Sequence, residues 1–199
     1  MHAILNGMKL YQSIVEPAVA VALKTGAVGV LPGDTVYGVM ARAADPAAVA
    51  RIFAAKQRDN KPGTVIAASA EQLAELGLKK RYMTAVQQYW PGAVSVIIPA
   101  GDELAYLHQG AHGLAVRIPD DEALLELLEQ TGPLMTSSAN LAGQPTATTL
   151  QQAIDYLGET VDFYVEGGDL SSRLPSTVIR IVDDAVEIVR QGAVTIDAD

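Results

Sequence analysis

The chain has no cysteine among its 199 residues. Disulfide bonds and thiolate metal sites are therefore excluded, and an intracellular protein is the simpler interpretation. Long apolar runs are also missing: nowhere do roughly 18 apolar residues follow one another, so we expect no membrane-spanning helix. The first residues lack the basic segment and apolar run of a signal peptide. We therefore expect a cytoplasmic protein.

Positive charge is scarce as well. The chain has 14 lysines and arginines against 23 aspartates and glutamates, which gives a net charge of −9 at pH 7. Such a surface repels phosphate backbones, and the few aromatic residues are not interleaved with basic ones as in single-strand binders. Broad nucleic-acid binding is disfavoured, whereas a local basic pocket for one small anion is compatible with this charge.

The familiar nucleotide and hydrolase motifs are absent too. There is no Gly-x4-Gly-Lys-Ser/Thr loop, no Gly-x-Gly-x-x-Gly after a strand, no zinc-protease helix motif and no Gly-x-Ser-x-Gly elbow. Any chemistry must therefore come from other segments.

What is present is an aliphatic globular composition, with 49% apolar and 19% charged residues. The length favours one compact domain over residues 1–199. Helical patterns alternate with short β-branched runs, which predicts an α/β fold. The predicted strands are 28–31, 64–67, 94–98, 114–116, 134–136, 163–165, 177–182 and 186–189. The predicted helices are about 13–26, 46–56, 71–76, 84–89, 121–129 and 149–156.

Only residues 183–185 separate the last two predicted strands, which suits a hairpin. We therefore expect a twisted mixed sheet, with helices packed around it, rather than a purely parallel one.

Four polar segments lie beside predicted strands or helix ends, where α/β proteins tend to bind ligands. The first, residues 31–38, places Asp34 and the hydroxyl of Thr35 beside two glycines. It suits a small-ligand contact or, equally simply, a Pro-Gly-Asp turn that joins two strands. The second, residues 56–62, contains Lys56 and Arg58 at a helix end. Such cations suit a polyphosphate, or merely complement the helix dipole.

The third segment, residues 136–143, offers hydroxyls, an amide and backbone N–H groups after a strand. It predicts an anion-binding nest or an ordinary Ser/Asn turn. The fourth is Arg117, at the end of an apolar strand, which suits either a substrate carboxylate or a structural ion pair. His108 and His112 have the spacing of a helical metal pair, but nearby glycines oppose a helix there, so no metal site is predicted.

Taken in order, these segments resemble the YrdC family over nearly the whole chain, from about residue 13 to 192. The resemblance is carried by Pro32…Asp34-Thr35-Val36-Tyr37-Gly38, Lys56-x-Arg58, Trp90-Pro91-Gly92, Val116-Arg117-Ile118-Pro119, Ser138-Ala139-Asn140, Pro175-Ser176-Thr177-Val178 and Arg190-x-Gly192. It implies a YrdC-like twisted mixed sheet around a concave, positively lined cavity. The short chain implies the single-domain form of the family, without the further C-terminal domain of longer members.

The resemblance also implies an activity. Synthase members of the family combine L-threonine, bicarbonate and ATP, with Mg²⁺ on the phosphates, into threonylcarbamoyl-AMP and pyrophosphate. Partner proteins then transfer the threonylcarbamoyl group to tRNA adenosine (t6A), so contact with tRNA is indirect. The alternative implied by other branches is a nucleotide- or RNA-binding homologue without synthase activity.

Roles for individual residues follow from the same resemblance. The residues implied to contact L-threonine are Thr35, Arg117, Thr136 and Ser176. Those implied to contact ATP are Arg58, Ser138, Asn140, Thr146 and Arg190, with Lys56 completing the phosphate cradle. The residues implied to be catalytic are Lys56, Arg58, Ser138 and Asn140. The chain departs from the family pattern at Gly33, at Ile66, at Ala93 and in a loop one residue shorter after Arg58. These departures concern the threonine pocket more than the ATP site.

Overall fold

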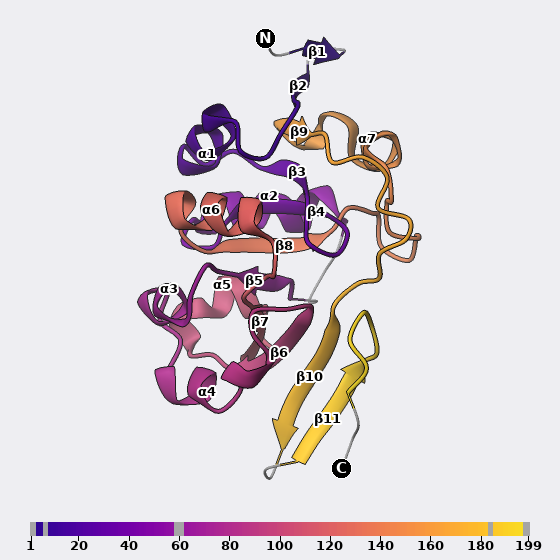
Figure 1. Ribbon diagram of the computed structural model, residues 1–199. Coiled ribbons are helices and arrows are strands. Elements are labelled where there is room, and N and C mark those ends of the chain that lie inside the picture. Colours follow the sequence, from indigo (N-terminus) through magenta and orange to yellow (C-terminus); the bar gives the residue numbers. More distant parts are fainter. Residues whose placement is uncertain (1–2, 6–7, 58–61, 183–184, 197–199) are drawn as a thin grey trace.

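The computed structural model describes residues 3–5, 8–57, 62–182 and 185–196 (Figure 1). Eleven strands in these ranges form one sheet in the order β1-β2-β9-β3-β4-β8-β5-β7-β6-β10-β11. The strands are β1 (Ala3–Leu5), β2 (Met8–Tyr11), β3 (Gly29–Pro32), β4 (Tyr37–Arg42), β5 (Thr64–Ile66), β6 (Val94–Pro99), β7 (Gly113–Arg117), β8 (Leu134–Ser138), β9 (Phe163–Val165), β10 (Thr177–Val182) and β11 (Ala185–Arg190).

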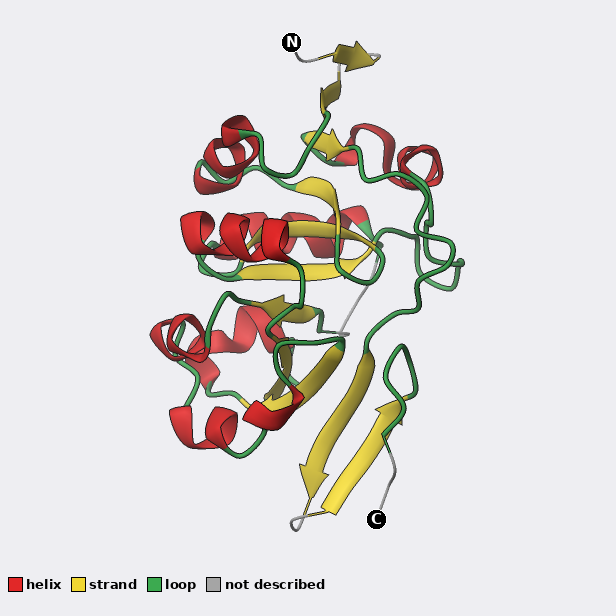
Figure 2. Cartoon of the chain, viewed as in Figure 1, coloured by secondary structure: helices red, strands yellow, loops and turns green. Residues whose placement is uncertain are grey.

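Seven α-helices in the same ranges flank the strands (Figure 2). They are α1 (Pro17–Lys24), α2 (Pro46–Ala55), α3 (Ala70–Glu75), α4 (Lys80–Thr84), α5 (Ala105–His108), α6 (Glu122–Thr131) and α7 (Leu150–Leu157). Short 3₁₀ turns occupy Gln87–Tyr89, Asp102–Leu104 and Gly158–Thr160. No helix in the described part of the chain is long and apolar enough to cross a membrane.

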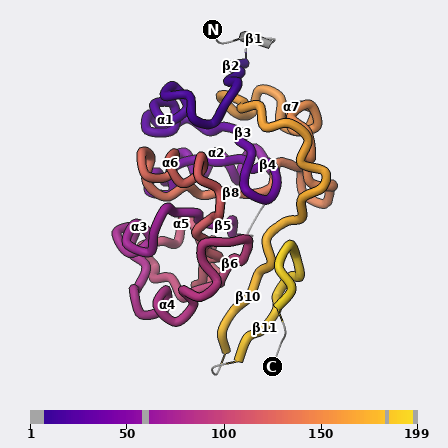
Figure 3. The backbone as a smooth tube through the Cα atoms, viewed as in Figure 1, coloured from indigo at the N-terminus to yellow at the C-terminus, as the bar shows by residue number. Residues whose placement is uncertain are grey.

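The sheet is mixed, as predicted. β5 pairs with β7 in parallel, whereas β6 pairs with β7 and β4 with β8 antiparallel. β10 and β11 form the predicted antiparallel hairpin, which lies at the opposite end of the molecule from β1 and β2 (Figure 3).

Local sequence explains where α2 begins. Asp45 accepts hydrogen bonds from the backbone N–H of Ala47 and Ala48, at 3.0 and 3.1 Å, and Pro46 takes the first helical position. Both are common features of a helix N-terminus. The helix ends at Ala55 with Lys56 as the capping residue, so the predicted start at 46 is confirmed and the predicted end at 56 is correct to one residue. Lys56 is thereby held beside the end of β8.

Alternate side chains of the central strands enter two separate cores. In β4, Val39 and Ala41 join the larger core, which α2, α5 and α7 cover, while Met40 joins the smaller core beneath α1 and α6. The period of two residues along a strand produces this division. The smaller core covers only part of its face of the sheet, and the uncovered part contains the site described below.

The helix predicted at 84–89 is wrong. The chain is helical earlier, in α4, and then forms only the 3₁₀ turn Gln87–Tyr89. Pro91 accounts for part of this difference, because the residue before a proline is driven to extended backbone. Trp90 has φ −127° and ψ 147°, which ends any helical path before Pro91.

Asp162 ties the start of β3 to α2, and its loss tests how much that link contributes. Its two oxygens accept from Val28 N and from Arg51 Nη2, each at 2.7 Å. Asp162→Ala is expected to lower the free energy of unfolding by roughly 1–2 kcal/mol, the sum of one exposed ion pair and one hydrogen bond. Urea unfolding at pH 7 measures this change.

The pH dependence supplies the control for Asp162. Burial raises its pKa, but the hydrogen bonds to Arg51 and Val28 outweigh burial and hold the pKa below its usual value. The carboxylate therefore stabilises the fold above the unfolded pKa of about 4, and this contribution is lost as the pH falls through the folded pKa. The variant and the original chain should converge in stability at acid pH. An equal difference at pH 7 and pH 2 would contradict the assignment.

Candidate functional site

A cavity of about 500 Å³ lies over the part of the sheet that α6 leaves uncovered. We call it the sheet cavity. Alternate residues of neighbouring strands form its floor, because side chains two apart on a strand share a face. They are Gly38 and Met40 of β4, Thr136 and Ser138 of β8, Thr64 and Ile66 of β5, Gly113, Ala115 and Arg117 of β7, and Val178 and Arg180 of β10.

Small residues keep this floor open. A Cβ atom at Gly38 would lie 2.5 Å from the hydroxyl oxygen of Thr136 on the adjacent strand. Glycine at this position therefore lets the Thr136 hydroxyl sit at the cavity surface, as predicted for a ligand contact.

The turn between β3 and β4 forms one wall. Gly33 donates its N–H to Val36 O at 3.0 Å, and Gly33, Thr35 and Val36 all line the sheet cavity. The segment is the predicted turn that joins two strands, and it also places Thr35, which is 6% exposed, at the cavity; the ligand contact of Thr35 stays a prediction.

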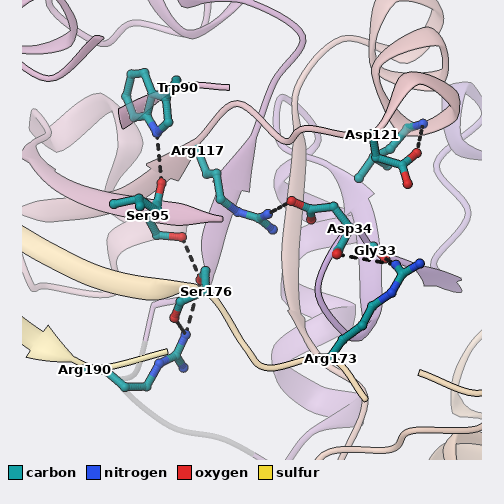
Figure 4. A network of polar contacts seen from close by, with 11 residues as sticks. Gly33, Asp34, Trp90, Ser95, Arg117, Asp121, Arg173, Ser176 and Arg190 are labelled. Carbon is teal, nitrogen blue, oxygen red and sulfur yellow. Dashed lines mark hydrogen bonds and ion pairs between the residues drawn. The ribbon is translucent and has the colours of Figure 1, made fainter. Parts of the chain in front are cut away.

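Arg117 reaches the sheet cavity from the end of β7 and forms a buried ion pair with Asp34 (Figure 4). Both side chains are 6% exposed. The donor is Nη1 of Arg117 and the acceptor is Oδ2 of Asp34. The ion pair, one of the two explanations predicted for Arg117, is therefore present, and the same side chain also lines the cavity.

Lys56, Ser138 and Asn140 are brought together as the resemblance implies, but in a particular way. Nζ of Lys56 donates to the backbone oxygen of Ser138, to Asn140 O at 2.7 Å and to Asn140 Oδ1 at 3.3 Å. Ser138 Oγ donates to the same Oδ1 at 2.6 Å, and Asn140 Nδ2 donates to Leu141 O and Gln144 O. Ser138 lines the sheet cavity, whereas Lys56 and Asn140 lie behind it and hold the loop in shape.

Arg190 and Ser176 meet at the opposite wall. Arg190 Nη2 donates to Ser176 O at 2.7 Å and to Ser176 Oγ at 3.3 Å, and Ser176 Oγ also contacts Ser95 Oγ at 3.0 Å (Figure 4). Burial, followed by the positive charge of Arg117, lowers the pKa of Arg190. Among the described residues no carboxylate pairs with this guanidinium. The residue as a whole is exposed, so this unpaired cation at the cavity wall is accessible to an anionic ligand and suited to bind one.

The predicted site residues thus fall into three groups. Thr35, Arg117, Thr136, Ser138, Thr146, Ser176 and Arg190 line the sheet cavity. Lys56 and Asn140 support its wall. Arg58 lies outside the described residues, so its placement stays a prediction.

Sequence reasoning did not select Arg180, which also lines the sheet cavity. It pairs with Glu187 through two hydrogen bonds, of 2.7 and 3.0 Å, across the β10–β11 hairpin. The signal was available in the sequence: Ser176, Val178 and Arg180 are two residues apart, so an extended chain turns them to one side.

The sheet cavity is electropositive, although the whole chain is acidic. Three arginines line it, and among the described lining residues there is no aspartate or glutamate. Asp34 and Glu187 each pair with one of these arginines from outside the lining, which leaves Arg190 as the uncompensated cation. A pocket of this kind attracts an anion locally despite the net charge of −9.

In the described part of the chain, one cluster has side chains that are close enough together to hold a metal ion: Asp102, His108 and His112. Nδ1 of His108 accepts from Gly110 N and His112 N, at 3.1 and 3.3 Å, and Nε2 contacts Gly101 O at 3.2 Å. Both ring nitrogens are used by the main chain. His108 is therefore well explained as a buried structural histidine, while the prediction that no metal binds here stays a prediction.

Comparisons with known proteins identify relatives of this chain. A relative from Mycobacterium leprae is 35% identical over 179 residues, covering 88% of this chain and 81% of the relative. The threonylcarbamoyl-AMP synthase of Vibrio campbellii is 33% identical over 178 residues, covering 86% and 95%. That of Bacillus subtilis is 31% identical over 182 residues, covering 88% and 53%.

Solved structures share the fold. Sua5 of Pyrococcus abyssi complexed with L-threonine matches with a TM-score of 0.81 and 28% identity, over 92% of this chain and 56% of that chain. YciO of E. coli matches with a TM-score of 0.75 and 25% identity, over 88% of this chain and 87% of the other. This chain thus spans just over half of the Sua5 chain. The model of the Sua5/YciO/YrdC family, described as "Telomere recombination", matches residues 21–192. With this match, the ordered motifs and the shared sheet have one explanation: the chain belongs to the Sua5/YciO/YrdC family.

Proposed function

We propose that this chain is a threonylcarbamoyl-AMP synthase, which uses L-threonine, bicarbonate and ATP and releases pyrophosphate. The relatives that bear this name support the proposal, as does the L-threonine complex of Sua5. The structural observation that carries it is the meeting of Arg190 with Ser176. A residue assigned to ATP and one assigned to threonine touch there, at 3.3 Å.

L-threonine occupies the part of the sheet cavity near Arg117 in this proposal. Arg117 binds the carboxylate through its remaining N–H groups, because a guanidinium matches a carboxylate in shape and charge. Thr35, Thr136 and Ser176 surround the same space with hydroxyl groups. Bicarbonate takes up a proton and loses water to give carbon dioxide, and the neutral threonine amine attacks its carbon. The new C–N bond forms as one C=O π bond opens to the carboxylate, and the amine proton is released, so the product is a carbamate.

ATP occupies the part near Ser138, Thr146 and Arg190. Arg190 offers the positive charge, and Ser138 offers a hydroxyl in a loop that Lys56 and Asn140 hold rigid. Arg58 adds a second cation in this proposal. Preorganised donors of this kind stabilise charge that develops on a transferring phosphoryl group.

Mg²⁺ enters as part of the ATP substrate, because the described residues that line the sheet cavity include no carboxylate to hold the ion. When bound, it neutralises charge on the phosphates. The task of the chain is then to bind and orient ATP and the carbamate formed from L-threonine and bicarbonate.

The bond changes balance as follows. A carbamate oxygen attacks the α-phosphorus of ATP, the bond from that phosphorus to the bridging oxygen breaks, and pyrophosphate leaves with the bond electrons. Ser176 and Arg190 hold the carbamate and the α-phosphate of ATP next to each other, and this proximity supplies most of the catalysis. The product is a reactive mixed anhydride, so a transfer reaction to tRNA adenosine, carried out by partner proteins, consumes it and yields t6A.

Pyrophosphate release is the test of this function. The purified chain should release pyrophosphate with ATP, L-threonine, bicarbonate and Mg²⁺, and release should fall to background when any one of them is omitted. The requirement for threonine is the informative part, because a general ATPase would not show it. Equal release without threonine, or tight binding of nucleotide without any release, would favour the alternative of a family member that binds nucleotide without synthase activity.

A further inference from the structure

The buried pair of Asp34 and Arg117 has a feature that a purely structural ion pair would not need. A single contact, from Nη1 to Oδ2, joins the two groups. Oδ1 of Asp34 and Nε of Arg117 are both buried and have no hydrogen-bond partner among the described residues. Buried polar atoms without partners lower stability. The arrangement is therefore poor as a stabilising device.

Asp34 stands behind the wall of the sheet cavity. Its neighbours Gly33 and Thr35 line the cavity, whereas Asp34 is not among the lining residues and its side chain points toward Arg117 (Figure 4). Arg173, from the segment before β10, holds the same turn by donating to Gly33 O at 3.1 Å and Asp34 O at 3.4 Å. Arg173 thus fixes the main chain of the turn at Asp34, and the carboxylate of Asp34 in turn fixes the guanidinium of Arg117.

The pair also sets the charge of this part of the cavity. Asp34 neutralises Arg117, while Arg190 at the opposite wall has no acidic partner among the described residues. A neutralised guanidinium still offers directional N–H donors to a carboxylate, but it attracts a polyphosphate far less. An amino acid and ATP are thereby distinguished by charge within one cavity.

From these observations we propose that Asp34 is a positioning and specificity residue: it aims Arg117 at the carboxylate of the amino acid and keeps phosphate groups out of that subsite. This proposal rests on the proposed function for the identity of the amino acid. Asp34 acts through Arg117 and contacts no reacting atom.

Calorimetric titration of L-threonine, of a non-hydrolysable ATP analogue and of pyrophosphate into Asp34→Asn tests the proposal. Threonine affinity should fall about tenfold, the loss expected when one charge-assisted contact no longer fixes the guanidinium. The affinity for the ATP analogue should stay within about twofold, since its subsite keeps Arg190 and Ser138. Pyrophosphate should become competitive with threonine. Asp162→Asn, a change in an exposed arginine-paired acid elsewhere, is the matched control and should alter none of these.

Two further variants separate position from charge. Asp34→Glu keeps the carboxylate but displaces it by one methylene, so the affinity for threonine should fall while pyrophosphate still does not compete with threonine. This variant also replaces Asp34→Asn if the latter does not fold. In an Arg117→Lys background, Asp34→Asn should have little further effect on threonine, because the route through Arg117 is already lost.

The outcomes distinguish this proposal from the proposed function. Unchanged threonine affinity in both Asp34 variants, or an undiminished effect in the Arg117→Lys background, would overturn the role of Asp34. If the original chain binds threonine but releases no pyrophosphate, the synthase function fails while the role of Asp34 is still measured by binding. If the original chain binds no threonine, the affinity for pyrophosphate decides. Asp34→Asn must then bind pyrophosphate more tightly than the original chain, and an unchanged pyrophosphate affinity would overturn the proposal.

Discussion

Replacing Lys56 with alanine is expected to destabilise the fold and to abolish pyrophosphate release together. The side chain is 2% exposed, and its ammonium group donates to the backbone oxygens of Ser138 and Asn140 and to the Asn140 side chain. Truncation removes a charged donor from these three part-buried oxygens: Ser138 O keeps the N–H of Asn140 and Asn140 Oδ1 keeps the Ser138 hydroxyl, whereas Asn140 O loses the ammonium group. We expect a loss of about 2–4 kcal/mol in the free energy of unfolding, or a fall of roughly 4–16 °C in Tm for a chain of this size.

The catalytic consequence follows from the same contacts. Without Lys56, the loop from Ser138 to Asn140 loses the group that fixes its main chain, so the Ser138 hydroxyl moves from its place in the sheet cavity. Pyrophosphate release should fall at least about 100-fold, equivalent to roughly 2.7 kcal/mol of transition-state stabilisation.

A matched pair of variants makes this test specific. Lys56→Met fills the same space without a donor, so it should recover part of the stability but none of the activity. Lys24→Ala, at an exposed lysine in the last turn of α1, should change neither. Full activity in Lys56→Met would contradict the structural role of the ammonium group and leave the helix-end dipole as its explanation.

Local signals allowed much of the fold to be predicted. Asp45 and Pro46 mark the start of α2 through a side-chain cap and a fixed φ angle, and both act within a few residues. The β10–β11 hairpin was equally accessible, because its turn is short. β2 was not predicted, because it is only four residues long and pairs in parallel with β9, which is far away in the sequence.

The site shows the same division. Motif residues such as Thr35 and Ser138 were found because their neighbours in sequence identify them. The partner of Arg117 was not, since Asp34 precedes it by 83 residues and only the pairing of strands brings the two together. For the same reason the sequence suggested that Lys56 faces a phosphate, whereas the structure directs its ammonium group to the main chain of β8 and the loop that follows.

Gly192→Ala is expected to disrupt the Arg190 wall of the sheet cavity. A Cβ atom at this position would lie 2.2 Å from Pro175 O and 2.6 Å from Ser176 O. These are main-chain atoms, so the segment after β11 must move away from the segment before β10. Such overpacking costs about 1–3 kcal/mol in the free energy of unfolding.

The displacement predicts a loss of nucleotide binding in the folded protein, in addition to the loss of stability. Arg190 is two residues before Gly192 and depends on Ser176 O, 2.7 Å away, for its orientation. We expect the affinity for a non-hydrolysable ATP analogue to fall roughly 10- to 100-fold, since a misplaced guanidinium loses a contact worth about 1.5–3 kcal/mol. Gly101→Ala is the control, because the atoms nearest to its Cβ belong to the flexible Glu103 side chain and not to the main chain. A folded Gly192→Ala protein with unchanged nucleotide affinity would show that Arg190 and Ser176 do not belong to the ATP subsite, and the contact that carries the proposed function would then have to be sought at Ser138 and Thr146.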